Sequence, residues 1–191
     1  ITTGCVSSIA RMPFVKFIQT AEFFQNGEVK FNLKATVRED LDVHLPRFGY
    51  EVVLLEENAK FTYYAKGPEE TYCDMNLHTF TGEYASSAEN EYVNYAYPQD
   101  HGNHFGAKSL VFSNGLGFIA HKAFEFAVSQ YDKLNVYKAK HPFDLVKTGK
   151  TYVRIDYKDT GVGSASCGPK IQPKYTLDDK EFEFEFILFN K

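Results

Sequence analysis

The sequence of 191 residues has no tryptophan and few cysteines, and no apolar run in it approaches the ~20 residues of a membrane-spanning helix. The first residues contain no basic segment that leads into an apolar one. We therefore expect neither a membrane anchor nor a signal peptide, and we assign the chain to the cytoplasm. A periplasmic or secreted location stays open, because a mature secreted protein has the same pattern.

Clustered positive charge is also missing. The chain has 21 Lys and Arg against 25 Asp and Glu, which gives a formal net charge of −4. The basic residues are scattered, whereas a phosphate backbone is held by a basic stripe or patch. We therefore expect neither nucleic acid nor a membrane as a partner.

The three cysteines, Cys5, Cys73 and Cys167, are far apart and show no CxxC spacing. An odd number at such separations argues against a disulfide framework and against structural zinc. The sequence predicts free thiols.

Aromatic residues are plentiful, with 18 Phe and 13 Tyr, and hydrophobic residues make up 43% of the chain. This composition predicts a packed core. The length fits one domain over residues 1–191, and no linker or repeat divides it.

The dominant hydrophobic period is two, which is typical of strands with one buried face. Apolar and polar residues alternate over residues 29–35, 152–157 and 181–186. Weaker strand candidates are residues 50–55, 61–65, 108–112, 118–120 and 124–128. We predict an all-β fold, an antiparallel β-sandwich with little helix.

Two segments look helical: a short turn at residues 67–70, and residues 132–140, where Asp132 is suited to cap the first turn. The longest loop candidate is residues 78–94, a stretch rich in Ser, Glu, Asn and Tyr.

Residues 95–108 gather aromatic, amide, imidazole and carboxylate groups around two glycines. Such groups bind sugar hydroxyls in fixed directions, while an aromatic face covers the C–H side of the ring. The carbohydrate-binding candidates in this segment are Asp100, His101, Asn103, His104 and Phe105.

A metal site is the alternative for Asp100, His101 and His104. Nothing in the sequence brings a third or fourth ligand near them. We expect polar loop histidines and no metal.

Glu69 and Glu70 are adjacent carboxylates beside a Gly-Pro turn. The two carboxylates of a retaining glycosidase face one bond across ~5 Å, and neighbouring side chains in a turn generally diverge. We predict that both are structural and hydrogen-bond the following loop, and that this chain carries no catalytic residue.

Four ordered motifs resemble the C-terminal domain of bacterial β-galactosidases of glycoside hydrolase family two. They are Leu45-Pro46-Arg47-Phe48-Gly49, Gly67-Pro68-x-Glu70-x-Tyr72-x-Asp74, Tyr97-Pro98-Gln99-x-x-Gly102-Asn103 and Asp156-x-x-x-x-Gly161-Val162-Gly163-Ser164. The resemblance covers about three quarters of the chain.

The resemblance implies a supersandwich similar to galactose mutarotases, in a fragment or small subunit of an enzyme that hydrolyses terminal β-galactosides. This segment would cover the active site and help to position sugar, and the catalytic glutamates would lie in a barrel outside it. No cofactor is expected here, although parent enzymes use Mg and Na in other domains. The implied partners are a galactoside or other sugar and the remaining domains or large subunit.

The family places an aromatic residue, often Trp, against the sugar. Counting back from Phe124 puts this position near Ala120, so the resemblance implies that Phe118 or His121 replaces the Trp. His104 stands where the family has Arg, so the substrate specificity is expected to differ from that for lactose.

Two other functions stay open. A mutarotase-like aldose epimerase would use His101 or His104 with a glutamate. A non-catalytic carbohydrate-binding or interaction module would have no chemistry of its own. For a fragment of a supersandwich, we also predict self-association through unpaired strand edges.

Overall fold

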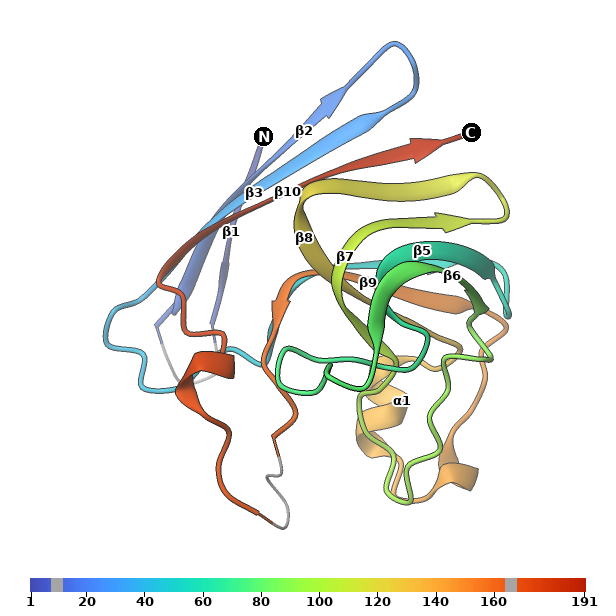
Figure 1. The fold of residues 1–191 in the computed structure, drawn as a ribbon. Coiled ribbons are helices and arrows are strands. Elements are labelled where there is room, and N and C mark those ends of the chain that lie inside the picture. Colours follow the sequence, from blue (N-terminus) through green and yellow to red (C-terminus); the bar gives the residue numbers. More distant parts are fainter. Residues whose placement is uncertain (8–11, 164–167) are drawn as a thin grey trace.

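The computed structural model describes residues 1–7, 12–163 and 168–191, and strands dominate these ranges (Figure 1). The strands are β1 Thr2–Val6, β2 Val15–Phe23, β3 Val29–Val37, β4 Arg47–Leu54, β5 Lys60–Gly67, β6 Phe80–Ser87, β7 Asn103–Phe112, β8 Leu116–Ser129, β9 Thr151–Asp159 and β10 Glu181–Asn190. The helical elements are α1 Lys133–Lys138 and the 3-10 turns η1 Pro142–Asp144 and η2 Pro173–Tyr175.

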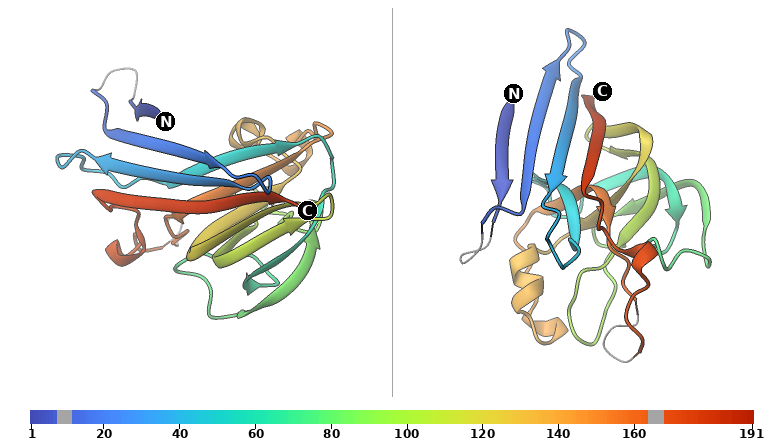
Figure 2. Two further views of the ribbon diagram at one scale, coloured as in Figure 1. Left: turned by 90° about the horizontal axis from the view of Figure 1, so that it is seen from above. Right: turned by 90° about the vertical axis from the view of Figure 1, so that its left-hand side faces the viewer.

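All strand pairs are antiparallel, in the order β1-β2-β3-β10-β8-β7-β5-β6, with β9 branching from β8 and β4 pairing β9. The long strand β8 bends, so that its first part pairs with β10 and its last part with β9. This bend folds the sheet into two layers (Figure 2). The predicted antiparallel β-sandwich is confirmed.

Aromatic side chains join the two layers. In β10, Phe182, Phe184 and Phe186 are buried, while the glutamates between them face solvent. Across the layers, the ring centroid of Phe48 in β4 lies 5.3 Å from that of Phe182, and the ring centroid of Tyr50 lies 5.2 Å from that of Phe186. Burying each such ring contributes roughly 1.5–3 kcal/mol, so the alternation along β10 determines which face becomes core.

Most predicted strands are confirmed, with one merger. The candidates at 118–120 and 124–128 are both parts of β8, which runs without a break over Leu116–Ser129. Between these two parts the register with β7 shifts, from Ile119 opposite Ser109 to Phe124 opposite Ala107.

The loop prediction for residues 78–94 is wrong, because β6 occupies Phe80–Ser87. This strand is at the end of the sheet and most of its residues are exposed or half-buried. Its sequence therefore carries little apolar alternation, and its ladder with β5 supplies the order.

The helix predicted from Asp132 is confirmed as α1, which ends at Lys138. The Asp132 carboxylate accepts hydrogen bonds from Leu134 N and Asn135 N, as an N-cap does. The helical turn predicted at residues 67–70 is wrong: this segment is non-helical, with a cis peptide between Gly67 and Pro68.

Cys5 and Cys73 are free thiols, as predicted, and Cys167 lies outside the described residues. Within the described ranges, no helix is long and apolar enough to cross a membrane.

Candidate functional site

Thr71 joins two of the sequence motifs. Its N–H donates to the carbonyl of Asn103 at 2.6 Å, and the Asn103 amide donates to the Thr71 carbonyl at 3.0 Å. The Thr71 hydroxyl also accepts from Phe105 N at 2.8 Å. The segment after Gly67-Pro68 therefore lies directly against the start of β7.

Glu70 holds the loop that precedes β7. Its carboxylate accepts from Gly102 N at 2.9 Å, from Tyr72 Oη at 3.5 Å and from Tyr95 Oη. The predicted structural role is confirmed for Glu70. Glu69 is exposed, and its predicted structural role stays a prediction.

Glu125, a carboxyl at 3% exposure on β8, links three strands. It accepts from Asn103 Nδ2 at 2.7 Å and from Asp159 N at 3.1 Å. Burial raises the pKa of Glu125 to about 8, despite these hydrogen bonds. Near neutral pH this group is mostly a neutral acid that bridges β7, β8 and β9.

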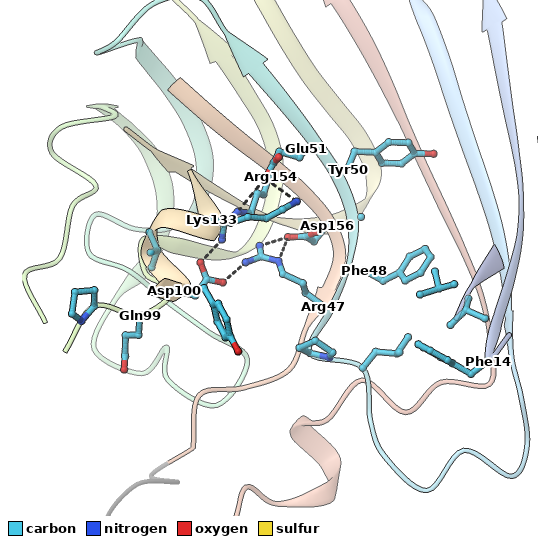
Figure 3. Close-up of a pocket in the computed structure, with 18 of the residues that line it drawn as sticks. Phe14, Arg47, Phe48, Tyr50, Glu51, Gln99, Asp100, Lys133, Arg154 and Asp156 are labelled. Atoms are coloured by element: carbon cyan, nitrogen blue, oxygen red, sulfur yellow. Dashed lines mark hydrogen bonds and ion pairs between the residues drawn. The ribbon is translucent and has the colours of Figure 1, made fainter. Parts of the chain in front are cut away.

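Arg47, at the start of β4, is surrounded by carboxylates (Figure 3). Its Nε donates to Asp156 at 3.0 Å, a second nitrogen bonds the same oxygen, and a third bonds Asp100 and lies 3.6 Å from Asp159. Burial opposes its charge, yet the three carboxylates together raise the pKa of Arg47.

The carboxylates around Arg47 respond differently. Burial acts to raise the pKa of Asp100, but Arg47 and Arg154 outweigh it, and the net shift is downward. Burial dominates at Asp159 and raises its pKa to about 7. Asp100 is thus ionised and lies at the surface, with 46% of its side chain exposed. The Asp159 side chain is buried.

Asp74 connects the second motif with the last. Its carboxylate accepts from Val162 N at 3.0 Å and from Gly163 N at 2.7 Å. A Cβ on Gly161 would lie 2.4 Å from the Asp74 carboxyl carbon, so only glycine allows this approach. Ser164, the end of the motif, lies outside the described residues.

Thr160 completes the junction with the first motif. Its N–H donates to the Pro46 carbonyl at 2.8 Å and its hydroxyl to the Leu45 carbonyl at 2.7 Å. Leu177 N donates back to the same hydroxyl at 2.9 Å. All four motifs therefore meet at one end of the sandwich.

Two of the predicted sugar-binding histidines, His101 and His104, are buried there. His104 is fully buried, with one ring nitrogen 2.7 Å from Glu91 and the other 3.1 Å from the Lys66 carbonyl. His101 is 6% exposed; its Nδ1 lies 2.8 Å from the Gln99 carbonyl. Its Nε2 is buried without a hydrogen-bond partner among the described residues.

The structure does not bring Phe118 and His121 to this cluster. Asn103 faces Ala127 on β8, nine positions beyond Phe118 (127 − 118) and up to roughly 30 Å away along an extended strand. Phe118 is in the core at 1% exposure, and His121 is exposed. Asp100, His101, Asn103, His104 and Phe105 do lie together.

A cavity of about 840 Å³ opens beside the cluster. Arg47, Asp100 and Arg154 form its charged end, and Phe14 and Phe48 belong to its apolar end (Figure 3). Of the predicted sugar-binding residues, only Asp100 lines it. The volume suits a small sugar or the side chains of a peptide segment.

In the described parts of the chain, no group of three or more His, Cys, Asp or Glu is arranged to hold a metal ion. The buried carboxylates are already engaged: Asp156 and Asp159 lie against Arg47, and Glu125 is hydrogen-bonded to Asn103. This arrangement is suited to holding loops in place, not to proton transfer with a solvent-accessible substrate.

Sequence reasoning missed the roles of Arg47, Thr71 and Glu125. A signal was present for Glu125, which stands between Phe124 and Phe126 in a strand that reads as buried on both faces. Arg47 was recognised only as part of the first motif, and Thr71 occupies an unspecified position of the second.

A sequence model of the family described as "Beta galactosidase small chain" matches residues 2–188. A β-galactosidase of Actinobacillus pleuropneumoniae is 30% identical over 189 residues, which are 98% of this chain and 19% of that protein. A β-galactosidase of Kluyveromyces lactis is 33% identical over 190 residues, 95% of this chain and 18% of that protein. The chain thus spans about a fifth of the length of these curated relatives.

Proposed function

Because the chain belongs to the β-galactosidase small-chain family, we propose that it acts as one domain of a larger enzyme that hydrolyses terminal β-galactosides. The observation that carries this is the family match over residues 2–188 of a chain that spans only about a fifth of its relatives. The rest of such an enzyme supplies the catalytic glutamates.

The role proposed for this domain is to cover the active site and help to position the sugar. Asp100 supports it, because two guanidinium groups orient its partly exposed carboxylate at the rim of the cavity. A carboxylate held in this way can accept hydrogen bonds from sugar hydroxyls without reorganising. Exposed Tyr97 on the same rim offers an aromatic face.

The other residues predicted to bind sugar differ in their exposure to solvent. Asn103 and His104 are buried, so in this proposal they hold the loop that carries Asp100. Phe105 is half-buried and His121 is exposed, and both stay candidates for direct contact with sugar. A cytoplasmic location and the absence of a cofactor in this segment stay proposals as well.

An aldose epimerase fits this geometry less well. His104 and Glu91 form a close pair, but they are 0% and 5% exposed, and the second ring nitrogen of His104 is bonded to a carbonyl. A sugar has no path to such a pair without opening of the core.

The test is an NMR titration of the chain with galactose and lactose, following the protein resonances and the rate of α/β anomer exchange. We expect shifts around Tyr97 and Asp100 and no acceleration of the exchange. Faster exchange would establish an epimerase. Saturable binding at a site far from the cavity would favour an independent carbohydrate-binding module.

A further inference from the structure

One side of the sandwich is open. Strand β1 ends one layer and pairs only with β2, and β4 ends the other layer and pairs only with β9, among the strands of the described ranges. Figure 2 shows β1 and β4 in different layers. The cavity of about 840 Å³ is lined from both, by Val6 of β1 and by the first half of β4.

The edge of β4, and not one of its faces, borders the cavity. Arg47, Phe48, Gly49, Tyr50 and Glu51 all line it. Side chains alternate along a strand, so a face would contribute only every second residue. Backbone N–H and C=O groups along this edge therefore face the cavity, where water or another strand can pair with them.

The two faces of β4 define the side chains that an added strand would carry. Phe48 packs between the layers, 5.3 Å from Phe182, whereas Glu51 points toward α1, 3.3 Å from Lys133. A strand beside β4 would continue both surfaces. Its apolar side chains would face Phe14 and Phe48, and its polar ones would face α1.

The charges that line the cavity balance. Arg47, Arg154 and Lys133 are paired with Asp100, Asp156 and Glu51. The cavity therefore selects neither an anion nor a cation. Four fifths of the relatives' length lies outside the matched region, so in an enzyme of that length any further segment would be present at high effective concentration.

We propose that an extended segment of the parent enzyme, outside these 191 residues, pairs with the free edge of β4 and closes the open side of the sandwich. The proposal rests on the proposed function, in that it takes the chain to be one domain of a larger enzyme. The segment alternates apolar and polar residues, and its apolar side chains fill the end of the cavity near Phe14 and Phe48.

Hydrogen exchange of the complete enzyme, resolved to single amides, tests this pairing. A strand paired on both edges protects every amide, whereas an edge strand leaves alternate amides free. We expect all amides of residues 48–54 to exchange at least ~100-fold more slowly than free peptide amides, as those in the centre of β5 do. Rapid exchange at alternate positions would overturn the proposal.

Two other occupants of the cavity would give different patterns of hydrogen exchange along β4. Either pattern would also overturn the proposal. Protection that disappears when the enzyme is diluted into single copies would indicate pairing with a second copy. Protection that appears only after addition of galactose would indicate a sugar groove.

Tyr137→Glu sharpens the test, because Tyr137 lines the cavity and is 83% exposed. We expect this variant to speed exchange along β4 at least ~10-fold, since a charge is placed against the added strand. Phe80→Glu, at an 82% exposed site on β6, is the control and should leave β4 unchanged. Equal exchange in both variants would count against the proposal. Hydrolysis of a β-galactoside by the same preparation tests the proposed function separately, so the two can fail independently.

Discussion

The two sides of the sandwich differ in how they meet their hydrogen-bonding needs. On the motif side, Glu70, Asp74 and Thr160 satisfy backbone N–H groups of neighbouring segments within the chain. On the open side, β4 presents an edge that no other strand of the described residues pairs with. The motif side is joined within the chain, although His101 Nε2 and Asn103 Oδ1 are buried there without partners among the described residues. The open side has no such junctions, and the outer edge of β4 is free to pair with another strand.

This difference explains why motifs alone do not locate function. Glycine, carboxylate and hydroxyl residues of the motifs are used to lock loops against one another, as Gly161 and Asp74 are. Surfaces that meet the rest of an enzyme need only suitable apolar residues and a free edge, and these leave no short sequence pattern.

The largest effect is expected for Arg47→Met, which breaks the motif side. The change leaves Asp156 and Asp159 buried without their cation. Removing one partner of a buried ion pair costs about 3–5 kcal/mol, and we expect that loss in the free energy of urea unfolding. Arg38→Ala, which removes a surface pair with Asp40, should change it by less than ~1 kcal/mol. Equal losses of unfolding free energy in Arg47→Met and Arg38→Ala would contradict the expected difference between the buried network and the surface pair.

Gly161→Ala is expected to have the next largest effect. The added methyl would meet the Asp74 carboxyl at 2.4–2.8 Å and push it away from Val162 N and Gly163 N. Overpacking of this kind costs about 1–3 kcal/mol, which thermal unfolding would show as a lower midpoint. In Gly82→Ala the nearest atom is 3.3 Å away, and the midpoint should hardly move.

A pH dependence follows from Glu125. Its pKa is about 8 in the folded chain against an ordinary 4.5, so folding retains a proton that the unfolded chain releases. Stability should therefore fall as pH rises from 4.5 to 8. In Glu125→Gln the slope should be smaller by up to ~1.4 kcal/mol per pH unit, measured by urea unfolding at several pH values.

The control for this slope is Glu39→Gln, at an exposed carboxyl, which should leave it unchanged. A residual slope is expected in Glu125→Gln, because Asp159, with a pKa raised to about 7, has the same sign. An identical pH profile for wild type and Glu125→Gln would refute the assignment of the proton to this group.

The smallest effect is expected on the open side. Tyr137→Glu should change the unfolding free energy of this chain by less than ~0.5 kcal/mol, because the side chain is 83% exposed and packs little. Calorimetry of the chain measures this directly. A loss comparable to that in Gly161→Ala would mean that the open side is part of the chain's own core.

The sequence predicted the sandwich because residues 29–35 and 181–186, which lie in β3 and β10, alternate between apolar and polar side chains, and such alternation indicates a buried face. It did not predict β6, whose order comes from its ladder with β5. The loop around Asp100 was recognised from its chemistry, but the burial of His104 depends on Tyr63 and Phe126, which are distant in sequence and pack against its ring. Arg47 as a common partner of three carboxylates required the fold.

The value of kcat/KM for a β-galactoside tests most directly whether the chain acts as a non-catalytic domain of a β-galactosidase. It should be measured for the complete enzyme, for the enzyme without residues 1–191, for this chain alone, and for the last two mixed. We predict no turnover by the chain alone, a loss of at least ~100-fold without it, and recovery on mixing, because the domain positions the substrate. Turnover by the chain alone, or full activity without it, would contradict this role.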